Sequence, residues 1–509
     1  MIKRFNLLII FLLSIILITS CKQPKPNDKN LNDNKGFAGT IYQIFVRSFS
    51  DSNKDGIGDF NGITQKLPYL KKLGVNALWL MPVHPSPTYH GYDVLDYYNV
   101  NPEYGTLDDF KNLIKKAAEE GIVIFLDMVF NHSSNQHEWF KAALQGDEKY
   151  RSYYNFVPSS KPTGNKWHNY GNSKYYGYFS SSMPDLNFFN QALQDEIFQI
   201  AEFWANLGVA GFRLDGALHF YGENEYPGQA YDYYDNIIFT KKLNQRMKAI
   251  NPNFYLLGEI WTDYKIYAEF MKNLSPVDFE ISDILTTTAS VSGNADYVRM
   301  INNRFNYYRT INSNFVSAPF LTNHDQDRIA SVINDDVRKL RMASEMLLTL
   351  PGTPIIYYGE EIGMKGYKSN GPIWDETRRL PFPWGDQSTT TWFNSSINDG
   401  LISAIEQESN PTSLLATYQR ISKIRNENIA LKYGNNIASY EHNNYRLQGY
   451  YREYTLENVH QRLLILHNFG NDRIPMVEYS GKIIYVTNQE EPSTITEILP
   501  KTTVIIDLG

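Results

Sequence analysis

Residues 211–219, GFRLDGALH, place a short apolar run directly before an acid and a glycine. Short runs of this kind, rich in β-branched residues and followed by polar ones, recur along the chain with amphipathic helical stretches between them. This alternation is typical of repeated βα units around a parallel sheet. The runs are Ile41–Val46, Ala77–Met81, Val123–Val129, Gly211–Asp215, Tyr255–Glu259, Val277–Ile281, Ser317–Leu321 and Pro354–Tyr358. Eight such units predict an α/β fold of the (β/α)8 TIM-barrel type, with functional groups at the C-terminal strand ends.

Two further regions interrupt or follow this pattern. Between the third strand and the next helix lie residues 131–187, dense in Tyr, Ser, Asn and Gly. A connection of that length needs a function or a fold of its own, so we expect a small inserted domain at the barrel mouth. After about residue 431 short strands replace helical stripes, as in 462–467, 482–486 and 503–506, which predicts a C-terminal antiparallel β-sandwich.

The N-terminus has the features of a secretory signal. Lys3 and Arg4 precede an apolar run over 7–18, and small residues then lead to Cys21. The run is too short for a comfortable transmembrane helix, and its end resembles the lipobox of bacterial lipoproteins, in which the cysteine is acylated. Cleavage by ordinary signal peptidase is the alternative. We expect a protein on the bacterial cell envelope that contacts the membrane only through Cys21.

These features divide the chain into five expected parts. They are a signal peptide (1–20), a lipidated disordered tether (21–35), a barrel (36–130 and 188–430), an inserted domain (131–187) and a C-terminal β-sandwich (431–509). Cys21 is the only cysteine, so no intrachain disulfide can form. Stability outside the cytoplasm must then come from the large core and a metal ion. We expect a monomer.

Charge and composition narrow the class of partner. The formal net charge is -7, and no Lys/Arg-rich block follows the extreme N-terminus, which excludes the electrostatic basis for nucleic-acid binding. Aromatic residues make up 14% of the chain. They suit flat ligands that present an apolar face and hydroxyl groups, although ordinary aromatic packing would explain the same number.

Three acids stand at or just beyond expected strand ends. They are Asp215, Glu259 in LLGEIW, and Asp325 in FLTNHDQDR. Any one of them alone would more often be a helix cap or a loop acid. Hydrolysis of a glycosidic bond with retention needs two carboxyls roughly 5–5.5 Å apart, one attacking and one passing protons. Strand ends of a barrel can supply that spacing.

Together with DMVFNH, which ends in His132, and MPDLN at 183–187, these segments resemble the ordered sequence regions of the α-amylase family of glycoside hydrolases. Within the family the chain looks close to the branch of oligo-1,6-glucosidases and neopullulanases. The resemblance covers nearly all of the chain after Gly36. It implies that Asp215 is the nucleophile, Glu259 the acid/base, and Asp325 a carboxylate that binds sugar hydroxyls and stabilises the transition state.

The resemblance also assigns residues around the three acids. His132 and His324 are similar to a pair of imidazoles that hydrogen-bond the sugar, and Tyr92 to its stacking platform. Arg213 lies two residues before Asp215 and hence on the same face of the strand, where its cation should keep the nucleophile ionised. Glu259 must start protonated, so we expect it in a less solvated and less cation-rich setting.

A metal site is expected in the segment DSNKDGIGDFNG. Asp51, Asn53, Asp55, the carbonyl of Ile57, and Asp59 occupy the alternating positions of an EF-hand-like Ca²⁺ loop. The final glutamate is missing because that position is a glycine, so the loop is a variant oxygen cage; a solvated acidic turn is the alternative. The segment resembles the calcium loop after the first strand in several relatives. A second calcium near Asn131 stays open.

The expected activity is retaining endo-hydrolysis of α-1,4-glucosidic bonds in starch, glycogen and malto-oligosaccharides. Exo-acting relatives often carry an acid three residues before the stacking tyrosine, where this chain has Tyr89, which favours an open groove. Leu218 stands where many relatives carry lysine, which leaves one contact on the reducing-end side in doubt. An exo-acting α-glucosidase, a cyclomaltodextrinase or neopullulanase, and a glucanotransferase stay open. A non-enzymatic surface glucan-binding lipoprotein is the alternative of another class.

Overall fold

A computed structural model describes residues 37–222, 233–291, 296–371, 373–489 and 494–509. The expected signal peptide, the tether and Cys21 lie outside these residues. In the described part no helix has the length and apolarity needed to cross a membrane.

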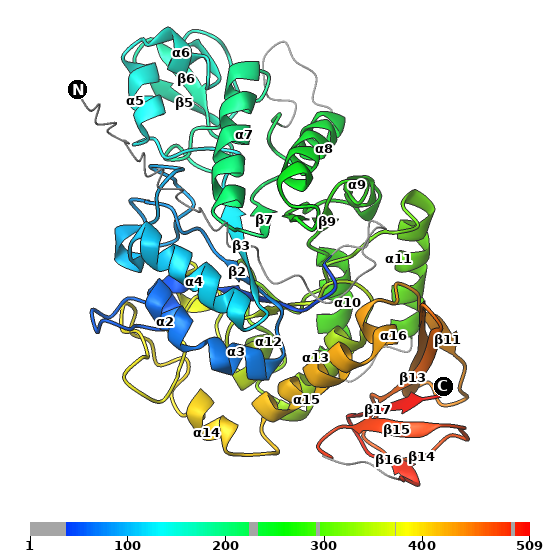
Figure 1. Cartoon of the computed structure of the whole chain (residues 1–509). Helices are drawn as coiled ribbons and strands as arrows, with labels where there is room; N and C mark the ends of the chain where they lie inside the picture. Colours follow the sequence, from blue (N-terminus) through cyan, green and yellow to red (C-terminus); the bar gives the residue numbers. More distant parts are fainter. Residues whose placement is uncertain (1–36, 223–232, 292–295, 372, 490–493) are drawn as a thin grey trace, which may run out of the picture.

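The centre of the molecule is a parallel sheet of the TIM-barrel type surrounded by helices (Figure 1). Its strands follow the order β10-β1-β2-β3-β7-β8-β9. Their bounds are β1 Ile41–Ile44, β2 Ala77–Leu80, β3 Val123–Met128, β7 Gly211–Leu214, β8 Tyr255–Gly258, β9 Ser275–Pro276 and β10 Ile355–Tyr357. Single parallel bridges from Val277 to Ala318 and from Phe320 to Ile355 link the two edge strands, β9 and β10, through residues 318–320.

Two of the eight expected strands differ from the prediction. The run expected at 277–281 is not a strand, because the Asp278 side chain accepts the Ile281 N–H and caps helix α10 from Phe279. The run expected at 317–321 forms only the two bridges. Pro319 stands in its middle and has no N–H to donate to a ladder.

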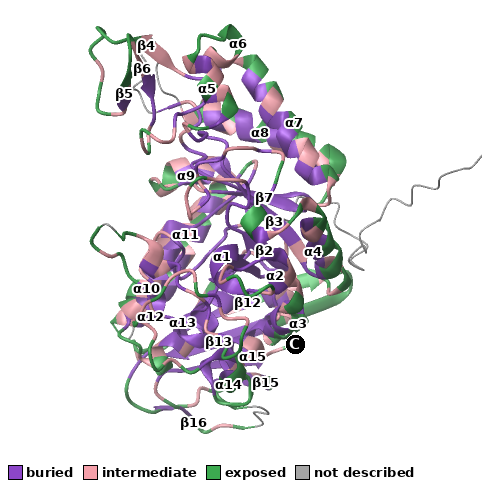
Figure 2. Ribbon diagram, turned by 90° about the vertical axis from the view of Figure 1, so that its left-hand side faces the viewer, coloured by how far each residue is buried: buried purple, intermediate pink, exposed green. Residues whose placement is uncertain are grey.

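Helices cover the outer face of the sheet. They are α2 Phe60–Gln65, α3 Leu67–Leu73, α4 Leu107–Glu119, α7 Gln191–Asn206, α8 Tyr233–Ile250, α9 Tyr264–Phe270, α10 Phe279–Ser290, α11 Tyr297–Ile311, α13 Val337–Thr349 and α15 Leu414–Glu427. Short helical turns join them: α1 Val46–Phe49, η1 Pro102–Tyr104, α12 Ile329–Val332, η2 Glu360–Ile362, η3 Glu376–Arg378, α14 Ala404–Glu408 and α16 Ile429–Lys432. Thr106 and Asp109 form a complete capping box at the start of α4, which buries its apolar stripe. Figure 2 shows the buried strands inside and the exposed faces of α4 and α7 outside.

Alternation along the strands separates two kinds of buried residue. In β2, Leu78 and Leu80 pack outward against the helices, and alternate residues of β1, β3 and β7 do the same. Ala77 and Trp79 belong to a second cluster on the other face of the sheet. Gly211 lies in that interior, where a Cβ would approach Phe125 to 2.6 Å. The interior is therefore filled near the strand starts, and functional groups have space only at the strand ends.

The two additional regions are both present. Within 131–187, helices α5 Glu138–Leu144 and α6 Glu148–Arg151 accompany an antiparallel sheet of β4 Phe156–Pro158, β6 Ser173–Tyr176 and β5 Trp167–Tyr170. The C-terminal region forms a five-stranded antiparallel sheet of β11 Ala438–Tyr440, β12 Leu447–Leu456, β13 Val459–Asn468, β17 Thr502–Asp507 and β15 Lys482–Val486. A separate two-stranded sheet, β14 Ile474–Pro475 with β16 Glu497–Ile498, shares its apolar core.

Buried polar groups join the C-terminal sheet to α13. The hydroxyls of Tyr485 and Thr487 donate to Oε1 of Glu345 at 2.7 and 2.6 Å. Glu345 is fully buried, and burial raises the pKa of its carboxyl to about 7. The two parts of the chain therefore meet through a carboxyl with a strongly perturbed pKa.

Candidate active site

The strand register brings a cation and two acids together. Asp127 and Arg213 are partners in the parallel pair β3 and β7, so both side chains leave the same face of the sheet. Nη1 of Arg213 donates to Oδ1 of Asp127 at 2.8 Å and to Oδ1 of Asp215 at 2.6 Å. Arg213 and Asp127 are almost completely buried.

The same guanidinium also reaches the next strand. Nη2 of Arg213 lies 2.8 Å from Oε2 of Glu259, directly after β8. Oε2 further accepts the backbone N–H of Gly216 at 2.9 Å. Gly216 has a φ of +50°, which turns the chain immediately after Asp215 and presents this N–H. Asp215 and Glu259, expected at the ends of neighbouring strands, thus flank one planar group.

Asp325 belongs to a second group of contacts at the same mouth. Its Oδ1 accepts from Nη2 of Arg379 at 3.0 Å, and its Oδ2 lies 2.9 Å from Nε2 of His324. The side chain of Asp325 is 35% exposed, whereas that of Asp215 is 10% exposed. Asp325 is therefore the most accessible of the three predicted acids.

Tyr92 connects these groups. Its hydroxyl lies 2.7 Å from Nε2 of His324 and 3.2 Å from Oδ2 of Asp127, and its ring stacks on His324 with an interplanar angle of 8°. Nε2 of His132 pairs with the Tyr92 carbonyl at 3.0 Å. Gln43 Nε2 pairs with Nδ1 of His324 at 2.7 Å, so Nδ1 accepts and Nε2 carries the hydrogen.

The acids carry more negative charge than the cation compensates. Burial raises the pKa of Asp127 to about 7, and it also raises the pKa values of Asp215 and Glu259, although Arg213 opposes the rise in each. The expectation of a less cation-rich setting for Glu259 is not met, because the guanidinium of Arg213 binds both carboxyls. Three acids around one arginine favour retention of a proton in the group.

The pKa values of Asp325 and of the two histidines are shifted downward, whereas those of the three acids around Arg213 are raised. Burial alone would raise the pKa of Asp325, but His324 and Arg379 hold it well below its usual range. Burial lowers the pKa of His324, and it lowers that of His132 to about 4. At neutral pH the site therefore combines an ionised Asp325 with two neutral imidazoles.

The inserted domain adds an aromatic side chain that the sequence did not single out. Phe179 is 47% exposed, and its ring lies 5.3 Å from that of His132 and 5.7 Å from that of His219. A Cβ on Gly216 would meet the Phe179 ring at 3.4 Å. Only the fold brings this residue beside Asp215. Asp127 and Arg379 were also missed, although the charged residue inside the apolar strand VIFLDM was a signal for Asp127.

The expected calcium loop is wrapped around its first acid. Asp51 accepts the N–H groups of Asn53, Lys54 and Gly56, and Asp55 accepts that of Ile57. Asp59 instead binds Ser52 and caps α2 at Gly62. Asp, Asn and carbonyl oxygens are the donors that Ca²⁺ prefers. In the described ranges, however, no three His, Cys, Asp or Glu side chains converge on a common metal position, so the carboxylates alone form no complete cage.

The second calcium position has a sparser donor set. Oδ1 of Asn131 and Oδ2 of Asp185 are both buried without a hydrogen-bond partner in the described part of the chain. Burial raises the pKa of Asp185 to about 7. Two oxygens are fewer than the six to eight that Ca²⁺ takes, and this position therefore supports no assignment.

The chain belongs to the α-amylase family: the family described as "Alpha amylase, catalytic domain" matches residues 43–434. It is 37% identical over 487 residues to "Alpha-amylase 3" of Dictyoglomus thermophilum, covering 92% of this chain and 93% of that protein. It is 33% identical to a 4-alpha-glucanotransferase of Thermotoga maritima, covering 76% and 87%. The crystal structure of an alpha-amylase from H. orenii superposes with a TM-score of 0.84 at 36% identity, covering 92% and 99%.

Proposed function

We propose that this protein hydrolyses internal α-1,4-glucosidic bonds with retention of configuration. The observation that carries the proposal is the shared guanidinium of Arg213, which binds Oδ1 of Asp215 and Oε2 of Glu259. Arg213 fixes one oxygen of each carboxyl and leaves the other oxygen of each available for the reaction. Membership of the family supports action on α-glucans, and the relative named an α-amylase supports hydrolysis.

The hydrogen bonds suggest which atoms react. Oδ1 of Asp215 is held by Arg213, so Oδ2 attacks the anomeric carbon while the bond from that carbon to the glycosidic oxygen breaks. Oε2 of Glu259 already accepts from Arg213 and Gly216, so the proton sits on Oε1 and passes to the departing oxygen. The product of this step is a glucosyl ester on Asp215.

The second half-reaction reverses the roles. Ionised Glu259 takes a proton from water, whose oxygen attacks the same carbon from the side opposite Asp215 and releases that carboxylate. The pKa of Glu259, raised by burial, allows it to carry a proton at the start. Asp325 is ionised, so it can accept hydrogen bonds from sugar hydroxyls and offset the positive charge that develops on the ring.

Tyr92 and the two histidines form the proposed sugar platform. The Nε2 atoms of His132 and His324 already bond to Tyr92, which locks the ring orientations before substrate arrives. The Tyr89 ring stacks on that of Trp392, with the ring centroids 5.5 Å apart. This aromatic pair lies beside Arg379, whose guanidinium carbon is 5.8 Å from the Tyr89 ring.

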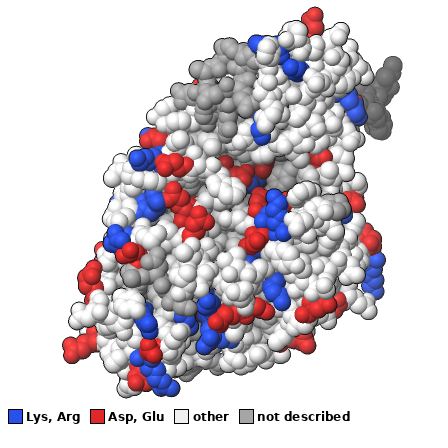
Figure 3. All heavy atoms as spheres, turned by 180° about the vertical axis from the view of Figure 1, so that it is seen from behind, with Lys and Arg blue, Asp and Glu red and all other residues white. Residues whose placement is uncertain are grey.

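We further propose that the loop at 51–59 binds Ca²⁺, that Cys21 carries a lipid anchor, and that the protein lies on the cell envelope. The loop's oxygen donors and its wrapping around Asp51 support Ca²⁺ as a structural ion. On the face drawn in Figure 3, acidic and basic side chains are interspersed among a mostly uncharged surface, which suits an uncharged polysaccharide partner. We propose no step of the reaction at the metal.

The deciding experiment is product analysis on starch, maltotriose, cyclodextrin and pullulan. Early release of mixed malto-oligosaccharides from starch supports endo-action. Glucose alone would favour an α-glucosidase, and longer products from maltotriose would favour a glucanotransferase, the activity named for the Thermotoga maritima relative. Preferential opening of cyclodextrin or pullulan would favour a cyclomaltodextrinase or neopullulanase, and absence of any product would favour a glucan-binding protein.

A further inference from the structure

Gln43 is a polar residue inside an apolar strand. It lies in β1, and its side chain is completely buried. Alternation along β1 places Gln43 on the same face as Ile41, which belongs to the cluster inside the sheet. A buried amide needs hydrogen-bond partners, and the reaction proposed above gives this one no role.

The partner of Gln43 is the imidazole of His324. Nε2 of Gln43 lies 2.7 Å from Nδ1 of His324, and an amide nitrogen can only donate, so Nδ1 accepts. Nε2 of His324 lies 2.7 Å from the Tyr92 hydroxyl and 2.9 Å from Oδ2 of Asp325. Because a carboxylate only accepts, Nε2 carries the single hydrogen of the neutral ring. Trp79, which pairs with Gln43 across β1 and β2, packs edge-on against this ring with the centroids 6.0 Å apart.

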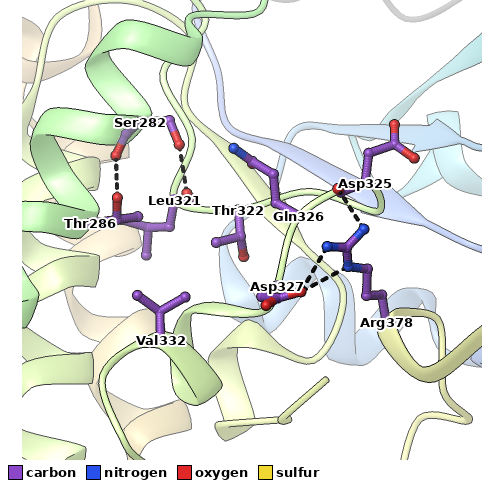
Figure 4. A pocket seen from close by; sticks show the side chains of 9 residues that line it. All are labelled: Ser282, Thr286, Leu321, Thr322, Asp325, Gln326, Asp327, Val332 and Arg378. Atoms are coloured by element: carbon purple, nitrogen blue, oxygen red, sulfur yellow. Dashed lines mark hydrogen bonds and ion pairs between the residues drawn. The ribbon is translucent and has the colours of Figure 1, made fainter. Parts of the chain in front are cut away.

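The charged groups around His324 act on its protonation in opposite directions. Burial lowers the pKa of this imidazole, Asp325 raises it, and Arg379 and Arg213 lower it further. Figure 4 shows the Asp325 carboxylate pointing away from Arg378, whose Nη1 donates instead to the main-chain carbonyl of Asp325 at 2.8 Å. Arg378 therefore leaves this carboxylate to His324 and Arg379, and the pull of Asp325 toward a charged ring has to be opposed elsewhere.

Gln43 opposes it at the other ring nitrogen. A second hydrogen on Nδ1 would point at the amide N–H, so the hydrogen bond from Gln43 is made only to the neutral ring. We propose that Gln43 is a positioning residue that keeps the imidazole of His324 neutral and fixes its orientation. An imidazolium at 2.9 Å would pair with Asp325 and weaken the negative charge with which that carboxylate stabilises the transition state. This inference rests on the proposed function.

The test replaces the amide without emptying the strand. Gln43→Met keeps the length of the side chain and removes the N–H that reaches Nδ1. Ile44→Met is the matched control, because Ile44 is the next residue of β1, is equally buried and packs toward the helices. Melting temperatures of both variants report on folding.

The first readout is the protonation of His324. Nitrogen NMR of protein labelled at histidine separates a ring nitrogen that carries hydrogen from one that does not, and His324→Asn identifies the signals. In wild type we expect hydrogen on Nε2 alone throughout the neutral range of pH. In Gln43→Met the ring should take its second hydrogen at higher pH, because the lost hydrogen bond stabilised only the neutral form. Ile44→Met should titrate as wild type does.

The second readout is hydrolysis of maltoheptaose. We expect kcat of Gln43→Met to fall about five- to tenfold with KM within about twofold of wild type, because the ring acts through the carboxylate that stabilises the transition state. Ile44→Met should leave both constants within about twofold of wild type.

Three results would overturn the role of Gln43. They are hydrogens on both ring nitrogens of His324 in wild type, equal titrations of His324 in wild type and folded Gln43→Met, and an unchanged kcat in that variant. A wild-type protein that releases no sugar from maltoheptaose or starch would instead overturn the proposed function, while the titration would still test the hydrogen bond from Gln43 to His324.

Discussion

Asp215 and Glu259 bind the two terminal nitrogens of one guanidinium, that of Arg213, at 2.6 and 2.8 Å. They follow adjacent parallel strands, β7 and β8, whose register places Arg213 beside Leu257. The distance between the two acids is thus set by the sheet and by the rigid planar cation. It does not depend on a flexible loop.

The first prediction concerns the two acids. Asp215→Asn removes the attacking carboxylate, and Glu259→Gln removes the transferable proton, so each should lower kcat on starch by roughly 100- to 10,000-fold. Circular dichroism should stay unchanged. The control is Asp108→Asn, whose side chain is 90% exposed on α4. Near wild-type activity in either active-site variant would refute the assigned roles.

The second prediction concerns the pH profile. The reaction needs Asp215 ionised and Glu259 protonated, so kcat/KM should fall at low pH as Asp215 gains a proton and at high pH as Glu259 loses one. Burial raises the pKa of Asp127 to about 7, so Asp127 is already neutral at the pH where Asp215 gains its proton, and Asp127→Asn mimics this neutral form. The acid limb of this variant should therefore stay in place. A clear shift of the acid limb in Asp127→Asn would contradict this account.

The third prediction concerns the join between α13 and the C-terminal sheet. Burial raises the pKa of Glu345 from 4.5 to about 7, so the folded state binds this proton more tightly than the unfolded state. Its stabilising effect is complete below pH 4.5 and is lost as pH rises through about 7. Glu345→Gln mimics the protonated form and should raise the free energy of unfolding by about 1–3 kcal/mol at about pH 8, with little change at about pH 4.

Thermal or urea unfolding at the two pH values measures this effect. In the Glu345→Gln variant the amide oxygen of the new side chain would still accept from Tyr485 and Thr487, which limits the perturbation. A change in the free energy of unfolding of the same size at both pH values would show that the carboxyl does not titrate in this range.

The fourth prediction concerns calcium. If the loop at 51–59 holds Ca²⁺, chelation should lower the melting temperature, because the ion binds only the folded loop. Asp51→Asn weakens the acid around which the loop is wrapped, so this variant should melt lower than wild type and respond less to chelation. An unchanged melting curve together with metal content near zero would remove the calcium proposal.

The fifth prediction concerns the anchor. Cys21→Ser removes the thiol that would be acylated, so the protein should move from the membrane fraction to the soluble fraction of the cell envelope or medium. Lys22→Ala is the matched control and should leave the distribution unchanged. Equal membrane association of wild type and Cys21→Ser would contradict lipid attachment.

Short patterns in the sequence predicted much of the fold and part of the candidate site. The expected strands at 77–81, 123–129, 211–215 and 255–259 are present within a residue of their bounds, because each is a short apolar run closed by polar residues. The run at 277–281 was misjudged because one side-chain cap at Asp278 outweighs β propensity. Local patterns also located Asp215, Glu259 and Asp325, but not Arg379 or Phe179, whose roles depend on contacts across long sequence separations.

The sequence by itself determined the alternation of strands and helices and the order of acids along the chain, because these depend on periodicity and on residue types at short spacing. Its motifs also carried the resemblance to the family. Only the tertiary structure decided that Arg213 serves both Asp215 and Glu259, that Arg379 holds Asp325, and that Gln43 donates to His324. The physical reason is that hydrogen bonds, desolvation and charge pairing depend on distances that strand register and barrel packing set, and these link residues far apart in the chain.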